Sequence, residues 1–126
     1  HYAHSLGGYI TSFGIDLMEK SELAMIDVRT MASPNLIKDG FFAKTTNYVS
    51  VRDGVPMIFD LSAYLQADPF GVLQACMCPM DSNVQWLGKW YDGWPLVDHS
   101  SVTETYQALL FTLGESFVAE YGSIPW

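Results

Sequence analysis

The chain has 126 residues, of which 49% are hydrophobic and 16% are charged, and this composition excludes an intrinsically disordered polypeptide. The formal net charge of -8 at pH 7 disfavours nucleic acids and anionic membrane surfaces as partners, because both carry negative phosphates. No run of about 18 apolar residues is present, so the sequence predicts no transmembrane segment. We expect residues 1–126 to form a single domain or the C-terminal fragment of one.

The first half of the chain alternates strand-like and helix-like segments. Helices are indicated by apolar residues at a spacing of three and four, and strands by short runs rich in apolar and β-branched residues. Glycine, proline and asparagine separate these runs. In chain order the sequence predicts the end of a strand at 1–4 whose beginning is missing, a helix at 6–20, and strands at 23–30 and 43–51.

The second half continues the alternation. It predicts short helices at 57–66 and 68–76, a strand at 83–87, and a final helix from 103 to 121. Seven apolar residues of that last helix lie on one predicted stripe, namely Tyr106, Leu109, Leu110, Leu113, Phe117, Val118 and Tyr121. Alternation of this kind predicts an α/β fold with a mostly parallel sheet flanked by helices, and further strands upstream would complete that sheet.

The segment from Ala3 to Gly7 joins the first strand to the first helix and has the pattern small-x-Ser-x-Gly. This pattern is typical of a nucleophile elbow, in which a serine occupies a strained turn and small neighbours let the backbone pass. We expect the hydroxyl of Ser5 to stand above the sheet edge. The backbone N–H of Leu6, at the helix N-terminus, is expected to point where an oxyanion would form.

An acidic residue and a histidine that could act together with Ser5 follow it along the chain. Asp53 follows the strand at 43–51, and His99 lies after the strand at 83–87. Both positions are at carboxyl ends of predicted strands, the edge where open α/β sheets build their sites, and the order serine, acid, histidine is that of α/β-hydrolases. The alternative for Asp53 is an ordinary turn aspartate, and for His99 an ordinary loop histidine.

These segments resemble the α/β-hydrolase lipases and esterases. His-Ser-Leu-Gly-Gly at 4–8 is similar to their elbow, Asp-Gly-Val-Pro at 53–56 to the element that carries the acid, and Asp-His-Ser-Ser at 98–101 to the histidine loop. The resemblance implies a catalytic triad of Ser5, Asp53 and His99. It also implies that a second oxyanion donor comes from upstream strands, supplied by a missing N-terminal segment or by a second chain.

Other chemistry-bearing residues have simpler interpretations. Cys76 and Cys78 sit among methionines and could suit a soft metal, but a buried apolar connection is the simpler interpretation. Trp90 and Trp94 lie in a glycine-containing loop before His99 and are candidates for a substrate pocket. Asp60, Asp92 and Asp98 remain alternative acids.

The sequence therefore supports two hypotheses. The first is a serine hydrolase that cleaves carboxylic esters or lipids through an acyl-enzyme, with no metal and no cofactor. The second is a non-catalytic module with a hydrolase-like fold that binds a partner through its aromatic loop or an exposed sheet edge. Neither composition nor cysteine usage identifies a cellular compartment.

Overall fold

The computed structural model describes residues 1–50, 53–59, 83–87, 99 and 104–122. Its elements, in chain order, are β1 (Tyr2–His4), α1 (Leu6–Gly14), the 3-10 helix η1 (Ile15–Leu17), α2 (Lys20–Leu23), β2 (Asp27–Met31), β3 (Lys44–Ser50), α3 (Gly54–Phe59), β4 (Val84–Leu87) and α6 (Glu104–Tyr121). None of the helices in this described part is both long and apolar enough to cross a lipid bilayer.

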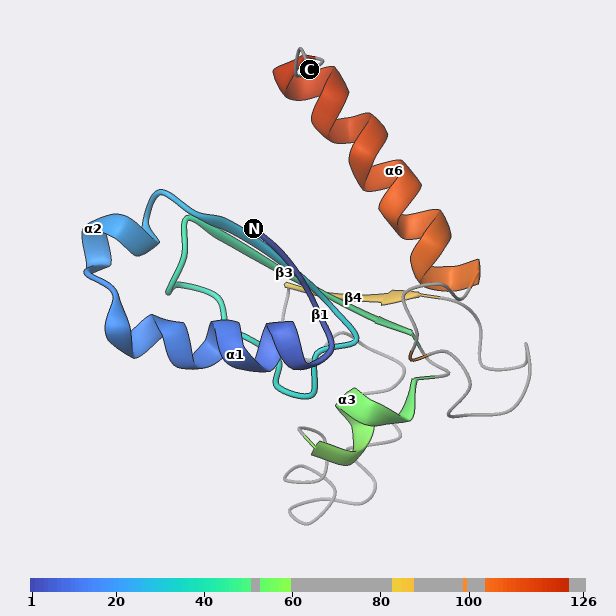
Figure 1. Cartoon of the computed structure of the whole chain (residues 1–126), viewed down its shortest axis with the longest axis horizontal. Coiled ribbons are helices and arrows are strands. Elements are labelled where there is room, and N and C mark those ends of the chain that lie inside the picture. Colours follow the sequence, from blue (N-terminus) through green and yellow to red (C-terminus); the bar gives the residue numbers. More distant parts are fainter. Residues whose placement is uncertain (51–52, 60–82, 88–98, 100–103, 123–126) are drawn as a thin grey trace.

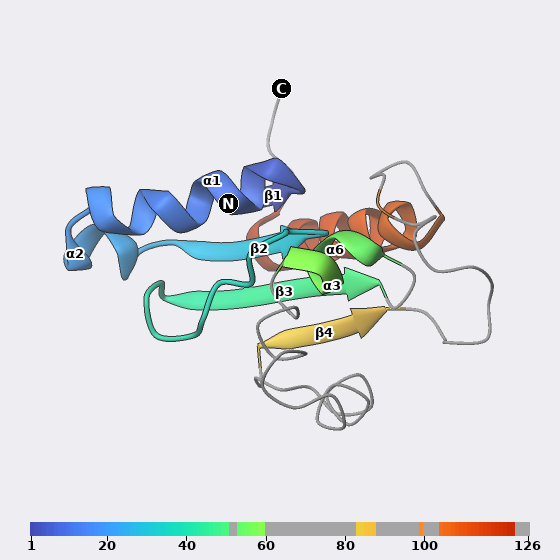
Figure 2. The same cartoon turned by 90° about the horizontal axis from the view of Figure 1, so that it is seen from below.

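The four strands form one parallel sheet in the order β1-β2-β3-β4. Their carboxyl ends consequently lie at the same edge of the sheet (Figure 2). Figure 1 shows α1 and α6 on opposite sides of this sheet. A parallel sheet covered by helices confirms the predicted α/β class.

Each face of the sheet carries its own hydrophobic cluster. Alternate residues of a strand point to opposite faces, so the faces can be assigned from the strand register. Towards α1 the cluster consists of Leu23, Val28, Ile37 and Phe42. Towards α6 it consists of Met31, Ala32, Tyr48, Tyr106 and Leu113. Through Tyr106 and Leu113 the second cluster packs α6 against the strands, and through Leu23 the first packs α2 against β2.

A buried asparagine ties the segment between β2 and β3 to the sheet. Asn47, on β3, is fully buried. Its Oδ1 accepts hydrogen bonds from the Thr30 hydroxyl at 2.8 Å and from the Ile37 N–H at 3.1 Å, and its Nδ2 donates to the Ile37 carbonyl at 2.9 Å. Asn83 donates to the same carbonyl from the start of β4. These side chains satisfy the buried N–H and carbonyl groups of Ile37, which lies outside the strands.

Helix α1 approaches the segment after β2 so closely that one helical position admits only glycine. A Cβ at Gly8 would lie 2.6 Å from the Cβ of Ser33 and would also overlap its hydroxyl, whereas a Cβ at Gly7 would meet the Cβ of Ala3 at an ordinary 3.7 Å. We expect Gly8→Ala to lower the free energy of unfolding by about 1–3 kcal/mol through overpacking. The matched Gly7→Ala should change it by less than about 1 kcal/mol.

Urea unfolding of the two glycine variants checks this prediction. The larger loss must belong to Gly8→Ala, because only there does the added methyl meet a side chain held in place: the Ser33 hydroxyl donates to the Asn35 carbonyl at 2.6 Å. Equal stability of the two variants would contradict the close packing of α1 on Ser33.

Several predicted boundaries were wrong. The helix predicted at 6–20 ends at Gly14 and is followed by η1 and α2, so the strand predicted from residue 23 starts at Asp27. The helix predicted at 57–66 already begins at Gly54. On the last helix, three residues of the predicted apolar stripe, Leu110, Phe117 and Val118, are exposed. Residues 60–82, where the second short helix was predicted, lie outside the described residues.

Candidate active site

Ser5 occupies the turn between β1 and α1 in a conformation that a residue with a side chain rarely adopts. Its φ is 51° and its ψ is -121°. The backbone is pinned there because the Ser5 N–H donates to the Met31 carbonyl at 2.9 Å and the Ser5 carbonyl accepts from the Gly8 N–H at 3.0 Å. A positive φ at a serine is strained and persists only where surrounding contacts enforce it. The side chain makes no capping hydrogen bond to α1, so the hydroxyl is directed elsewhere.

The Ser5 hydroxyl meets the imidazole of His99. The distance from Ser5 Oγ to His99 Nε2 is 2.7 Å, although 94 positions separate the two residues. On the other side of the ring, His99 Nδ1 lies 3.0 and 3.1 Å from the two carboxylate oxygens of Asp53. A carboxylate only accepts, so Nδ1 carries the proton of the neutral ring and Nε2 is left to accept from the Ser5 hydroxyl. The three groups form one chain of hydrogen bonds.

Asp53 is fully buried and is surrounded by donors. It follows β3 and precedes α3, and its Oδ1 accepts from the Val55 N–H at 2.9 Å. Oδ2 accepts from the Tyr106 hydroxyl at 2.9 Å. A buried carboxylate is tolerated only when hydrogen bonds replace its lost hydration. These donors hold both oxygens in position facing His99.

Tyr106 is a site residue to which the sequence analysis assigned no role in the site. Its side chain is fully buried, and its hydroxyl donates to Asp53 while accepting from the Ser50 N–H at 2.9 Å. The hydroxyl thus connects α6 to the end of β3 and to the acid. The sequence signal for this role is a tyrosine on the helix that follows the histidine. A buried tyrosine hydroxyl needs a hydrogen-bond partner.

We expect Tyr106→Phe to leave the Ser50 N–H without this acceptor and Asp53 with one donor fewer. The free energy of unfolding should fall by about 1–3 kcal/mol, because two buried hydrogen bonds are lost and one of them goes to a carboxylate. The rate at which Ser5 reacts with a fluorophosphonate should also fall, because Asp53 is held less firmly. The control is Tyr9→Phe, which removes an exposed hydroxyl. An unchanged rate and an unchanged stability in Tyr106→Phe would contradict this role.

His4, the last residue of β1, contacts His99. His4 Nε2 donates to the His99 carbonyl at 2.9 Å. The two imidazole centroids are 5.7 Å apart, and the His4 ring also makes an edge contact with Tyr106 at 6.1 Å. The structure shows that His4 holds the backbone of the residue that bonds to Ser5.

The N–H groups of Leu6 and Gly7 belong to the first turn of α1, directly after Ser5. The first N–H groups of a helix have no partner within the helix. In the described part of the chain, Gly8 and Tyr9 donate to the Ser5 carbonyl, and no hydrogen bond is found for the N–H of Leu6 or Gly7. The predicted oxyanion donor, Leu6, therefore lies at the helix N-terminus beside the hydroxyl. The partial positive charge of that terminus favours an anion there.

The remaining predicted site residues fall outside the described part of the structure. These are the pocket candidates Trp90 and Trp94, the thiols Cys76 and Cys78, and the alternative acids Asp60, Asp92 and Asp98. Within the described residues, no three histidine, cysteine or acidic side chains cluster as a metal site would require.

Comparison of the chain with family models, with curated proteins and with solved structures finds no match. The geometry around Ser5 is therefore the basis for a proposed function.

Proposed function

We propose that this protein is a serine hydrolase that cleaves carboxylic esters, lipid esters included, through an acyl-enzyme formed on Ser5. One observation carries the proposal: the hydrogen-bond chain from Ser5 Oγ to His99 Nε2 at 2.7 Å and from His99 Nδ1 to the buried Asp53 at 3.0 Å. A base within hydrogen-bond reach of a hydroxyl, itself oriented by a third group, is the arrangement that activates a serine. The positive φ of Ser5 adds support, because a serine in a strained turn between strand and helix is typical of a nucleophile elbow.

The chemistry follows from the protonation states that the contacts impose. His99 Nε2 takes the proton of the Ser5 hydroxyl while Oγ forms a bond to the ester carbonyl carbon, and the carbonyl oxygen becomes an oxyanion facing the Leu6 N–H. The imidazolium returns that proton to the departing alcohol oxygen as the ester bond breaks. A water molecule then repeats the sequence on the acyl-Ser5 ester and releases the acid. Asp53 stabilises the imidazolium in both halves and stays ionised.

The family is part of the same proposal. A parallel sheet, a serine at a strained strand-to-helix turn, and the chain order Ser5, Asp53, His99 favour an α/β-hydrolase-like fold. The rival hypothesis, a non-catalytic binding module, does not require the hydroxyl, the imidazole and the carboxylate to be hydrogen-bonded in series.

Hydrolysis of p-nitrophenyl butyrate tests the proposal. The expected result is a turnover that requires the Ser5 hydroxyl. Ser5→Ala should reduce the rate to that of buffer. Ser116→Ala is the matched control, because this exposed serine on α6 bonds only locally, to the Thr112 carbonyl. Wild-type protein no faster than Ser5→Ala would favour the binding module.

A further inference from the structure

His4 and Ser5 are consecutive residues, and the side chains of both bond to residue 99. His4 Nε2 donates to the His99 carbonyl at 2.9 Å, and the Ser5 hydroxyl donates to His99 Nε2 at 2.7 Å. Within the described residues, no other hydrogen bond to the His99 main chain is found. The main chain and the ring of His99 are thus both attached to the carboxyl end of β1 and the turn after it.

The sheet fixes the position from which His4 makes this bond. His4 pairs with Met31 in the register of β1 and β2, and the N–H of the next residue, Ser5, donates to the Met31 carbonyl at 2.9 Å. The strand pairing therefore holds the Cα atoms of His4 and of the nucleophile in one rigid element. A base whose main chain is attached to the same element keeps a constant distance from the nucleophile.

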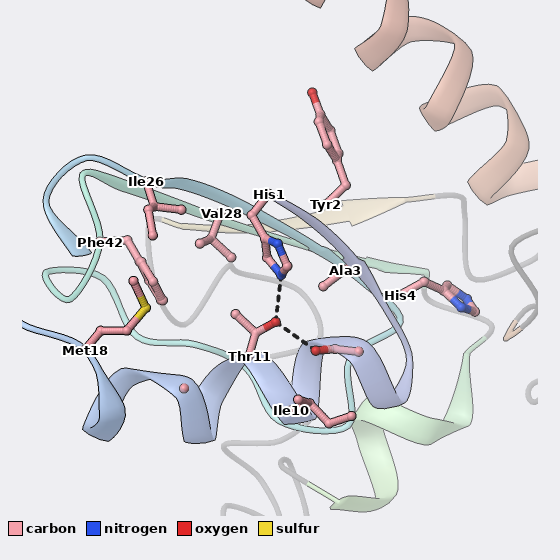
Figure 3. A pocket seen from close by; sticks show the side chains of 12 residues that line it. His1, Tyr2, Ala3, His4, Ile10, Thr11, Met18, Ile26, Val28 and Phe42 are labelled. Carbon is pink, nitrogen blue, oxygen red and sulfur yellow. Dashed lines mark hydrogen bonds between the residues drawn. The ribbon is translucent and has the colours of Figure 1, made fainter. Parts of the chain in front are cut away.

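Two neighbouring rings keep the His4 imidazole in place. His4 is half-buried, and its ring centroid lies 5.7 Å from that of His99 and 6.1 Å from that of Tyr106, which it meets edge-on. Figure 3 shows this ring beyond the end of β1, directed away from the apolar side chains of Val28 and Phe42. The ring is therefore directed towards His99 rather than into the apolar cluster on the α1 side of the sheet.

The two imidazoles carry their protons on opposite nitrogens. A carbonyl oxygen only accepts, so His4 carries a proton on Nε2, whereas the neutral His99 ring carries its proton on Nδ1, facing Asp53. A neutral His4 ring is sufficient for this bond. The bond therefore requires no positive charge 5.7 Å from the ring that becomes an imidazolium in the proposed reaction, where a like charge would oppose it.

We propose that His4 is a positioning residue of the site: by holding the His99 main chain to β1, its imidazole sets the distance between His99 Nε2 and Ser5 Oγ. The inference rests on the proposed hydrolase function. Among the described hydrogen bonds, His4 makes its side-chain bond to His99 and to neither Ser5 nor Asp53, so it acts on the reaction through the base. Without this bond the imidazole reaches the hydroxyl in a smaller fraction of molecules, and acyl transfer slows while ester binding is retained.

Two amide variants separate this hydrogen bond from the rest of the side chain. The amide nitrogen of glutamine lies as many bonds from Cα as Nε2 of histidine does, whereas that of asparagine lies one bond nearer. With p-nitrophenyl butyrate, His4→Asn should lower kcat by about tenfold or more and leave KM within about twofold, the pattern of a misplaced reacting group. His4→Gln should keep kcat within about threefold of the wild type. The control is His1→Asn, because His1 bonds to Thr11 at the other end of β1.

Nuclear magnetic resonance of the His99 carbonyl carbon reports the same bond without turnover. A carbonyl carbon whose oxygen accepts a hydrogen bond resonates at lower field than one whose oxygen does not. In substrate-free, isotopically labelled protein, this resonance should move to higher field in His4→Asn and remain in place in His4→Gln. His4→Phe keeps an aromatic ring against Tyr106 but has no donor, so it should behave as His4→Asn does, and it carries the test if His4→Asn does not fold.

Two results would overturn the inference alone, in a wild type that hydrolyses the ester. The first is a kcat in folded His4→Asn equal to that of the wild type or of His4→Gln, and the second is a His99 carbonyl resonance that stays in place in the variants without the donor. No ester hydrolysis by the wild type, with the carbonyl resonance moving as expected, would instead reject the proposed function and leave the anchoring of His99 by His4 standing.

Discussion

Asp53→Asn is expected to slow the reaction of Ser5 with a fluorophosphonate by about 10⁴-fold, the loss typical when the acid of such a triad becomes an amide. An amide at position 53 can offer an N–H to His99 Nδ1, and the ring then carries its proton on Nε2. Nε2 lies 2.7 Å from Ser5 Oγ and could no longer accept the hydroxyl proton. The measurement is the second-order labelling rate followed by intact-protein mass.

Asp39→Asn is the matched control, since Asp39 is exposed in the segment before β3. Its labelling rate should equal that of the wild type. Circular dichroism of Asp53→Asn must show a folded protein, because Val55 and Tyr106 also donate to this carboxylate and lose part of their acceptor. A folded Asp53→Asn variant that labels at the wild-type rate would remove Asp53 from the site.

The largest effect on stability is expected for Asn47→Ala. The change leaves the Thr30 hydroxyl and the Ile37 N–H without their buried acceptor, while the Ile37 carbonyl keeps its hydrogen bond from Asn83. Each unsatisfied buried group costs about 1–3 kcal/mol. We therefore expect the free energy of unfolding to fall by about 3 kcal/mol or more, and Tm to fall by roughly 10 °C.

Thermal unfolding of Asn47→Ala beside Asn35→Ala checks this expectation. The Asn35 side chain is only half-buried and donates one side-chain hydrogen bond, to Ser12 at 2.9 Å. Its loss should cost about 1 kcal/mol. Equal melting temperatures of the two variants would show that the hydrogen bonds of Asn47 contribute no more to stability than the single hydrogen bond of Asn35.

The sheet was predictable because its strands are short β-branched and apolar runs between loop residues. Val28, Thr45, Thr46 and Val49 mark β2 and β3 within a few residues of their ends. The break of the first helix at Gly14 was not predictable from periodicity, because Leu17 and Met18 continue the apolar spacing although both are exposed. Periodicity reports which residues could share a face and not whether a neighbour covers that face.

The meeting of Ser5, Asp53 and His99 could be anticipated from chain order at the carboxyl ends of parallel strands. The supporting contacts could not. The Tyr106 hydroxyl reaches Asp53 across 53 positions, and the His4 imidazole reaches the His99 carbonyl across 95. Such contacts depend on the positions of α6 and His99 relative to the sheet. A local sequence pattern does not specify these positions.

The most direct measurement of the central claim is the mapping of a fluorophosphonate adduct by tandem mass spectrometry. The account predicts that Ser5 alone among the serines carries the adduct, and that His99→Ala abolishes labelling while Ser116→Ala preserves it. An adduct spread over several serines, or labelling of Ser5 that persists at the wild-type rate in a folded His99→Ala variant, would contradict the claim that His99 activates Ser5.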